Sequence, residues 1–146
     1  MLYDHVSELE LEVEDYGLGQ RERDTSSGFT RATTIVSLHG DGETGRGEDV
    51  TYDNDAHEAL DGSAGDFRIS GEYTLDEFSD HVSEIDLFHG TEPNQSMFRN
   101  YRQWAFESAA LDLALKQSNT NLADCLGRTY DPVRFVVSTR LEDPPT

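Results

Sequence analysis

The chain has 146 residues and carries 30 acidic against 11 basic side chains, so its formal net charge at pH 7 is −19. This charge excludes nucleic acid and anionic membranes as expected partners, because binding to phosphates requires clustered cations. The first five residues lack the pattern of a signal peptide. No apolar run has the ~20 residues that span a bilayer. We therefore expect a soluble, cytoplasmic protein of one main domain.

The acidic residues are spread along the chain from Asp4 to Asp143 and are interleaved with apolar residues. This distribution indicates a solvated coat over a folded domain rather than a disordered acidic tail. Lys116 is the single lysine. Such a composition resembles that of salt-adapted archaeal proteins, in which concentrated salt screens the repulsion between like charges.

The first third of the chain predicts a three-stranded antiparallel meander. Residues 9–13 alternate between apolar and acidic side chains, which is typical of a strand with one wet face. Residues 16–28 are rich in glycine, serine and charge, and we interpret them as a long loop. A second strand is predicted over 30–38, followed by a tight turn at Gly40–Gly42 and a third strand over 43–52.

The rest of the chain predicts mainly helices. Residues 53–71 are rich in Asp, Gly and Ser and predict a loop with one helical turn near 56–60. Capping-box spacing and apolar periodicity predict later helices over 74–87, 96–117 and 122–126, with Gly127 ending the last one. Residues 133–138 are apolar on both faces, which is typical of a strand buried in a parallel sheet.

Side chains that form catalytic or metal sites lack the required spacing. The five histidines form no pair at metal-ligand spacing on one helix face. Asp53–Asp55 begins like a calcium-binding loop, but Glu58 and Ala64 stand where that loop needs glycine and glutamate. We interpret Cys125 as a packed thiol. The sequence therefore assigns no catalytic residue and no metal ligand to this chain.

Two stretches carry a more specific pattern. The first is Asp41-Gly42-Glu43-Thr44-Gly45-Arg46-Gly47-Glu48, whose glycines allow close backbone approach. The second is Ala105-Phe106-Glu107-Ser108-Ala109-Ala110-Leu111-Asp112, followed by Lys116 and Leu126-Gly127. Both resemble the N-terminal capping domain of the enolase superfamily, in its mandelate racemase / muconate lactonizing enzyme branch. The departures are leucine at Leu111, where tryptophan is common, and an apparent insertion over 59–71.

The resemblance implies an α+β capping domain over residues 1–130 and the start of a (β/α) barrel over 131–146, with 133–138 as the first barrel strand. Family enzymes abstract the proton α to a carboxylate, and a magnesium ion stabilises the product anion. The metal ligands and bases lie on barrel strands. This chain alone is therefore expected to be inactive, and Mg²⁺ is implied only for the full-length enzyme. Glu107 and Asp112 are expected to cap or bridge backbone where this helix meets the barrel.

In the family, two loops of the capping domain close over the barrel mouth and select the distal part of the substrate. These loops correspond here to residues 16–28 and 49–57. The substrate-facing residues that this correspondence predicts are Tyr16, Arg21, Arg23, Phe29 and Tyr52. The implied partners are the protein's own barrel, a small carboxylate substrate and further copies of the chain. The alternative is a stand-alone acidic α+β module for binding or assembly, without enzymatic activity.

Overall fold

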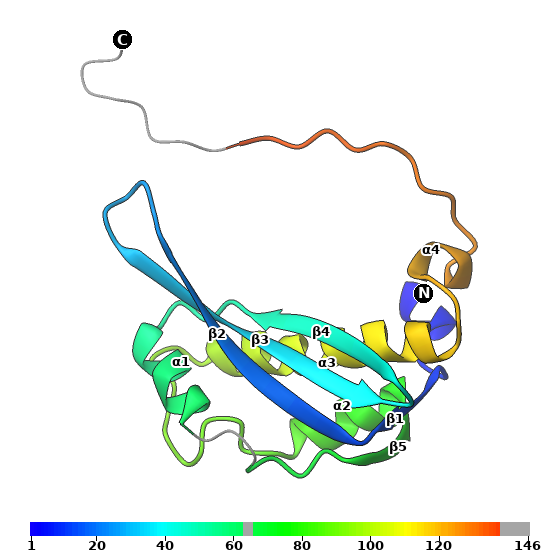
Figure 1. Cartoon of the computed structure of the whole chain (residues 1–146), viewed down its shortest axis with the longest axis horizontal. Helices are drawn as coiled ribbons and strands as arrows, with labels where there is room; N and C mark the ends of the chain where they lie inside the picture. Colours follow the sequence, from blue (N-terminus) through cyan, green and yellow to red (C-terminus); the bar gives the residue numbers. More distant parts are fainter. Residues whose placement is uncertain (63–65, 138–146) are drawn as a thin grey trace.

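The computed structural model describes residues 1–62 and 66–137. Its centre is a three-stranded antiparallel sheet in the order β2 (Asp15–Asp24), β3 (Thr30–Gly40) and β4 (Glu43–Asp49). The long helix α3 (Met97–Gln117) crosses one face of this sheet (Figure 1). The predicted fold class, an α+β domain with a three-stranded antiparallel sheet followed by helices, is confirmed.

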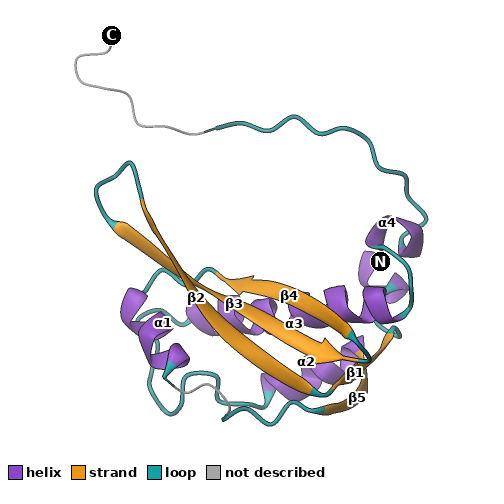
Figure 2. Cartoon of the chain, in the orientation of Figure 1, coloured by secondary structure: helices purple, strands orange, loops and turns teal. Residues whose placement is uncertain are grey.

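The remaining elements surround this pair of layers (Figure 2). A second, two-stranded antiparallel sheet joins β1 (Glu10–Val13) to β5 (Gly71–Thr74). The shorter helices are η1 (Leu2–His5), α1 (Asn54–Asp61), α2 (Leu75–Ser83) and α4 (Leu122–Cys125). Among the described residues, no helix is long and apolar enough to cross a membrane.

The composition of the sheet differs from the prediction in one strand. Residues 10–13 do form a strand, but β1 pairs with β5 instead of joining the three-stranded sheet. The predicted loop over 16–28 is wrong, because most of it is β2, which pairs residue by residue with β3 from Asp15–His39 to Asp24–Thr30. Only residues 25–29 remain as the connection between the two strands.

The strand β2 was hidden by its glycines and charges, which are depleted in strands on average. Its period of two is nevertheless present. Tyr16, Leu18 and Gln20 alternate with Gly17 and Gly19. Hydrogen bonds to β3 stabilise this segment as a strand, although its residues have low intrinsic preference for one. Tertiary structure therefore overrides local propensity here.

The predicted helices are confirmed with small shifts at their ends. At the start of α2, the Glu77 N–H donates to the Thr74 hydroxyl oxygen at 3.2 Å, and the Thr74 N–H donates to the Glu77 carboxylate at 2.8 Å. This is the expected capping box. Helix α4 ends before Gly127, whose φ of 63° suits a residue without a side chain.

The strand β4 and the helix α3 approach each other closely enough for their backbones to touch. A Cβ atom added to Gly45 would lie 2.1 Å from the Ala109 carbonyl oxygen, and one added to Gly47 would lie 2.0 Å from the Ala105 carbonyl oxygen. No side chain fits into either space. The glycines and alanines that carry the family resemblance therefore meet, as their small side chains predict.

The core lies between the sheet and the helices. Val36 and Leu38 of β3 face α3 and are fully buried, as are Phe78 of α2 and Phe106 of α3. Burial of each such side chain stabilises the fold by roughly 1.5–3 kcal/mol. The opposite face of the sheet carries the half-buried side chains of β3, and we call it the outward face. It is seen from the front in Figure 1.

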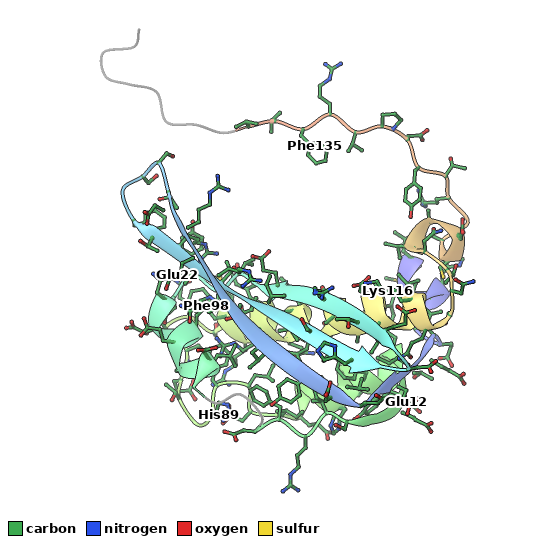
Figure 3. All side chains as sticks on the ribbon, in the orientation of Figure 1. Glu12, Glu22, His89, Phe98, Lys116 and Phe135 are labelled. Carbon is green, nitrogen blue, oxygen red and sulfur yellow. The ribbon has the colours of Figure 1, made fainter. Side chains whose placement is uncertain are left out.

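The predicted strand over 133–138 does not form within the described residues. Residues 133–137 pair with no strand, and Ser138 lies outside the described residues. The side chains of Val133, Phe135, Val136 and Val137 are between 71% and 92% exposed. Figure 3 shows Phe135 on a segment that extends away from the domain. Exposed apolar side chains this close together are typical of a surface at which another body can pack.

The contact between β4 and α3 is testable with two glycine substitutions. We expect Gly47→Ala to lower the free energy of unfolding by about 3 kcal/mol or more, because the helix backbone must move to admit the new methyl group. Gly19→Ala is the matched control, since its Cβ would meet nothing within 4 Å. Urea denaturation of both variants measures the difference. Equal stability of the two variants would contradict the packing described.

Candidate functional site

The residues predicted to face a substrate divide between the two faces of the sheet. Register places Arg23 opposite Arg31 and Arg21 opposite Thr33, so both arginines of β2 lie on the outward face. Tyr16 lies on the inner face. Its hydroxyl oxygen accepts a hydrogen bond from the Phe67 N–H at 2.8 Å, and its ring packs on the Phe67 ring at 6.0 Å. The structure therefore separates Tyr16 from the other predicted residues.

The other four residues gather with Arg31 at the end of the β2–β3 hairpin. The Arg31 guanidinium lies over the Tyr52 ring, 3.5 Å from its centroid, and the Phe29 and Tyr52 rings are 6.3 Å apart. Arg21 and Arg23 extend this group along β2. We call these five residues, Arg21, Arg23, Phe29, Arg31 and Tyr52, the arginine–aromatic cluster. It adjoins a shallow hollow of about 310 Å³ that Thr30 and residues 53–55 complete.

The guanidinium groups of the cluster have the chemistry to bind an organic anion, whereas Asp53 and Asp55 in the adjoining hollow would repel one. Arg23 and Arg31 face each other across the two strands, and like charges in that position destabilise a strand pair. None of the ion pairs formed by described residues involves Arg21, Arg23 or Arg31. A carboxylate between these guanidinium groups would relieve the repulsion and accept hydrogen bonds in the bidentate geometry that arginine favours.

The segment after β4 is held in place by Arg31. Its guanidinium donates to the Thr51 carbonyl oxygen at 3.0 Å and also to the Val50 carbonyl oxygen. The Thr51 hydroxyl in turn donates to the Asp49 carboxylate at 2.6 Å. Because both ends of this segment are bonded, Tyr52 is presented to solvent on a fixed backbone and is 65% exposed.

Beneath the cluster lies a buried ion pair between β4 and α3. The Arg102 Nε donates to the Asp49 carboxylate at 2.7 Å, and both side chains are at most 2% exposed. The remaining guanidinium nitrogens donate to the carbonyl oxygens of Leu87 and Ala56. Arg102 also lies 4.0 Å from the centroid of the Phe88 ring. Hydrogen bonds from Arg102 therefore link α3 to the sheet, to α1 and to the α2–α3 connection.

His57 belongs to this buried network and not to a lid loop. It lies inside α1, where its Nε2 donates to the Thr51 carbonyl oxygen at 2.8 Å and its Nδ1 bonds the Thr34 hydroxyl at 2.8 Å. The predicted lid segment over 49–57 is thus only partly a loop, because α1 begins at Asn54.

Two further hollows lie elsewhere on the molecule. One is a cleft of about 680 Å³ between α1 and the α2–α3 connection, lined by several acids, including Asp53, Asp55, Asp66 and Glu92. The other, of about 280 Å³, lies between α2 and α3, beside Tyr3 and Trp104. There, burial and a hydrogen bond to Asp76 raise the pKa of Tyr3 to about 12. In the part of the chain that the structure describes, no three His, Cys, Asp or Glu side chains are grouped as metal ligands.

Sequence reasoning missed three of the residues that shape this site. Arg31 stands in a β-branched strand and carries no motif, and only the register of β2 and β3 brings it opposite Arg23. Arg102 and Asp49 are 53 positions apart, and nothing in the sequence distinguishes them from the many exposed charged residues of this chain. The available signal for Arg102 was its place in a helix whose flanking apolar residues are buried, including Phe98 and Ala105.

Fold and site together define a small α+β domain with an arginine–aromatic cluster on the uncovered end of its sheet. A protein-family model described as "Domain of unknown function (DUF8230) N-terminal domain" matches residues 4–125, and the chain belongs to this family. No curated protein and no solved structure matches the chain.

The buried ion pair makes a stability prediction. We expect Asp49→Ala to lower the free energy of unfolding by about 3–5 kcal/mol, because it leaves the Arg102 charge buried without its partner. Glu92→Ala is the control, since it breaks an exposed ion pair with Arg99 and should cost at most about 1 kcal/mol. Chemical denaturation of both variants checks this, and a loss at Asp49 no larger than that at Glu92 would contradict it.

Proposed function

We propose that this chain is the N-terminal capping domain of a magnesium-dependent enolase-superfamily enzyme. In this proposal a barrel domain carries out proton abstraction α to a carboxylate, with racemisation, dehydration or cycloisomerisation as the outcome. The present chain contributes substrate selection and has no catalysis of its own. The magnesium ion would be held by carboxylates of the barrel, so this chain's residues supply none of its ligands.

One observation carries the proposal: the two sequence stretches that resemble the family form a single contact. The glycine strand β4 packs on the alanines of α3, and Asp112 of α3 accepts a hydrogen bond from the Arg46 N–H of β4 at 2.9 Å. Lys116 donates to Asp112 at 3.1 Å and to the Thr44 carbonyl oxygen at 2.7 Å. Two stretches that belong to one structural signature are expected to meet in this way.

Glu107 has a related role on a different side of α3. Its carboxylate accepts hydrogen bonds from the Ser79 hydroxyl at 2.5 Å and from the Gln103 amide at 3.0 Å. Glu107 therefore links α3 to α2, and Asp112 links α3 to β4. Asp112 thus bonds a backbone N–H of this domain's own sheet, whereas the partners of Glu107 are side chains, and a contact of either acid with a barrel stays a prediction.

The arginine–aromatic cluster is the part of the domain that suits substrate selection. It stands on a hairpin whose end extends past β4 (Figure 1), since β4 pairs only with residues 34–40 of β3. A projecting hairpin can lie over the mouth of an adjoining domain, exclude water and present arginines to an anionic group of the substrate. The family description as an N-terminal domain also supports a second domain after this one.

The second candidate is a stand-alone acidic module for binding or assembly. The observation that favours it is the uncovered outward face of the sheet, together with the exposed apolar residues 133–137. Both features suit a contact with another domain or protein, but neither requires that this partner be a catalytic barrel. The salt-adapted composition is compatible with either function.

The coding sequence beyond Thr146 separates the two candidates. The capping function predicts a barrel with Lys-x-Lys on its second strand and acidic metal ligands on the next three strands. A stop codon directly after Thr146 would contradict the capping function and support the module.

In the protein that includes the barrel, we expect Arg21→Ala together with Arg23→Ala to lower kcat/KM by about 10- to 100-fold for substrates with a distal anionic group. The loss corresponds to one or two charge-assisted hydrogen bonds. Arg68→Ala with Arg128→Ala is the matched control, because it removes two exposed arginines from outside the cluster. Unchanged kcat/KM for every accepted substrate would show that the cluster does not select substrate.

A further inference from the structure

The strand β2 is the outer member of the order β2–β3–β4, and among the described residues its edge is free over Leu18, Gln20 and Glu22. The Thr25 N–H donates to the Phe29 carbonyl oxygen. This bond determines which residues of β2 are hydrogen-bonded to β3 and which are not, because the two kinds of pair alternate along an antiparallel ladder. The odd-numbered residues of β2 therefore bond β3, whereas Leu18, Gln20 and Glu22 direct their N–H and C=O groups to the free edge. Among the described residues, no backbone group of another segment bonds these three. The Gln20 carbonyl oxygen receives only a 3.5 Å contact from its neighbour Arg21.

Native proteins shorten, bulge or cover such an edge, because it is a template for pairing with another strand. The strand β2 is ten residues long and pairs with β3 in unbroken register, without a bulge. Two glycines stand in its middle. A Cβ on Gly19 would meet nothing within 4 Å, and one on Gly17 would meet only His39, at 3.9 Å. The packing inside the domain therefore does not explain these glycines, and glycine inside a strand often marks close approach by another backbone.

The charges on the outward face of β2 are self-complementary. On the outward face the order is Asp15, Gly17, Gly19, Arg21 and Arg23, with the acid at one end and the arginines at the other. Two copies of this strand, placed antiparallel about a two-fold axis through Gly19, bring Asp15 of each copy opposite Arg23 of the other. Gly19 then faces Gly19 at a position where side chains approach most closely, and Leu18 exchanges hydrogen bonds with Gln20. On the inner face, the same pairing places Asp24 opposite Glu14 of the other copy, which opposes it.

We propose that β2 pairs with β2 of a second copy of this chain and forms a continuous six-stranded antiparallel sheet. The contact is isologous, so it closes at a dimer instead of growing into a fibre. Nucleic acid and anionic membranes do not fit this edge, because the net charge of −19 repels polyanions. A second copy supplies both the carboxylate that matches Arg23 and a free edge of matching length.

The proposal does not require the capping function, but it engages Arg23 of the arginine–aromatic cluster, so that Arg21 and Arg31 are the guanidinium groups left to bind an anion in the dimer. In the paired arrangement Arg21 lies opposite Gly17, so its guanidinium remains open to solvent, while Arg23 is engaged by Asp15 of the other copy. The repulsion between two copies of charge −19 opposes the pairing at low salt. At about 1 M salt the screening length falls to about 3 Å, which removes the long-range repulsion and leaves the hydrogen bonds across the strands.

The test is sedimentation of the 146-residue chain in about 1 M KCl. We expect a concentration-dependent dimer, and we expect Arg23→Asp or Asp15→Arg alone to raise its Kd about tenfold or more, because each reversal places like charges opposite each other twice. The double variant D15R/R23D restores the attraction and should recover the dimer. Arg68→Asp is the matched control, since it changes the net charge as Arg23→Asp does and lies outside β2.

Hydrogen exchange provides a second measurement that needs no variant. The amides of Leu18, Gln20 and Glu22 should become protected as the chain concentration rises, while exposed amides outside β2 keep their exchange rates. A chain that stays monomeric at all concentrations overturns the proposal. A dimer that Arg23→Asp and D15R/R23D leave unchanged, or one that forms without protecting these amides, overturns it as well, because its interface then lies elsewhere.

Discussion

The backbone contact between β4 and α3 is the constraint on which the rest of this structure depends. Gly45 and Gly47 have no space for a side chain against Ala105 and Ala109, so helix and strand can meet only at this register. With α3 fixed on the sheet, neighbouring turns of the helix place Arg102 within hydrogen-bond distance of Asp49. They also place the Asp112 carboxylate where it accepts from the Arg46 N–H. One close approach therefore determines where the polar links between the layers form.

The buried ion pair extends this constraint to the candidate site. Arg102 bonds Asp49 at the end of β4 and also the carbonyl oxygens of Ala56 and Leu87, which belong to three different parts of the chain. Asp49 then holds Thr51, and Arg31 holds the backbone at Val50 and Thr51. Tyr52 stands directly after these fixed residues. Buried contacts of Arg102 and Asp49 therefore help to fix the position of Tyr52, and the exposed hairpin alone does not determine where the arginine–aromatic cluster lies.

Sequence reasoning predicted much of this architecture because local signals were strong where packing demanded them. The capping box at Thr74, the turn at Gly40–Gly42 and the length of α3 all follow from short-range chemistry. It failed at β2, where Gly17, Gly19 and four consecutive charges conceal a strand that only pairing with β3 reveals. The same failure affected the prediction of the site. The register of β2 and β3 places Arg31 opposite Arg23 on the outward face. Tyr16 is an even-numbered residue of β2 and therefore lies on the inner face, away from the other predicted residues.

We propose that the end of the β2–β3 hairpin lies over the mouth of an adjoining catalytic domain. The most direct measurement is a structure of the protein that includes this domain and whatever follows it, with a substrate analogue bound. The account predicts that Arg21 and Tyr52 face the analogue across the domain boundary. A structure in which the hairpin end points into bulk solvent, with the analogue bound away from it, would contradict this account.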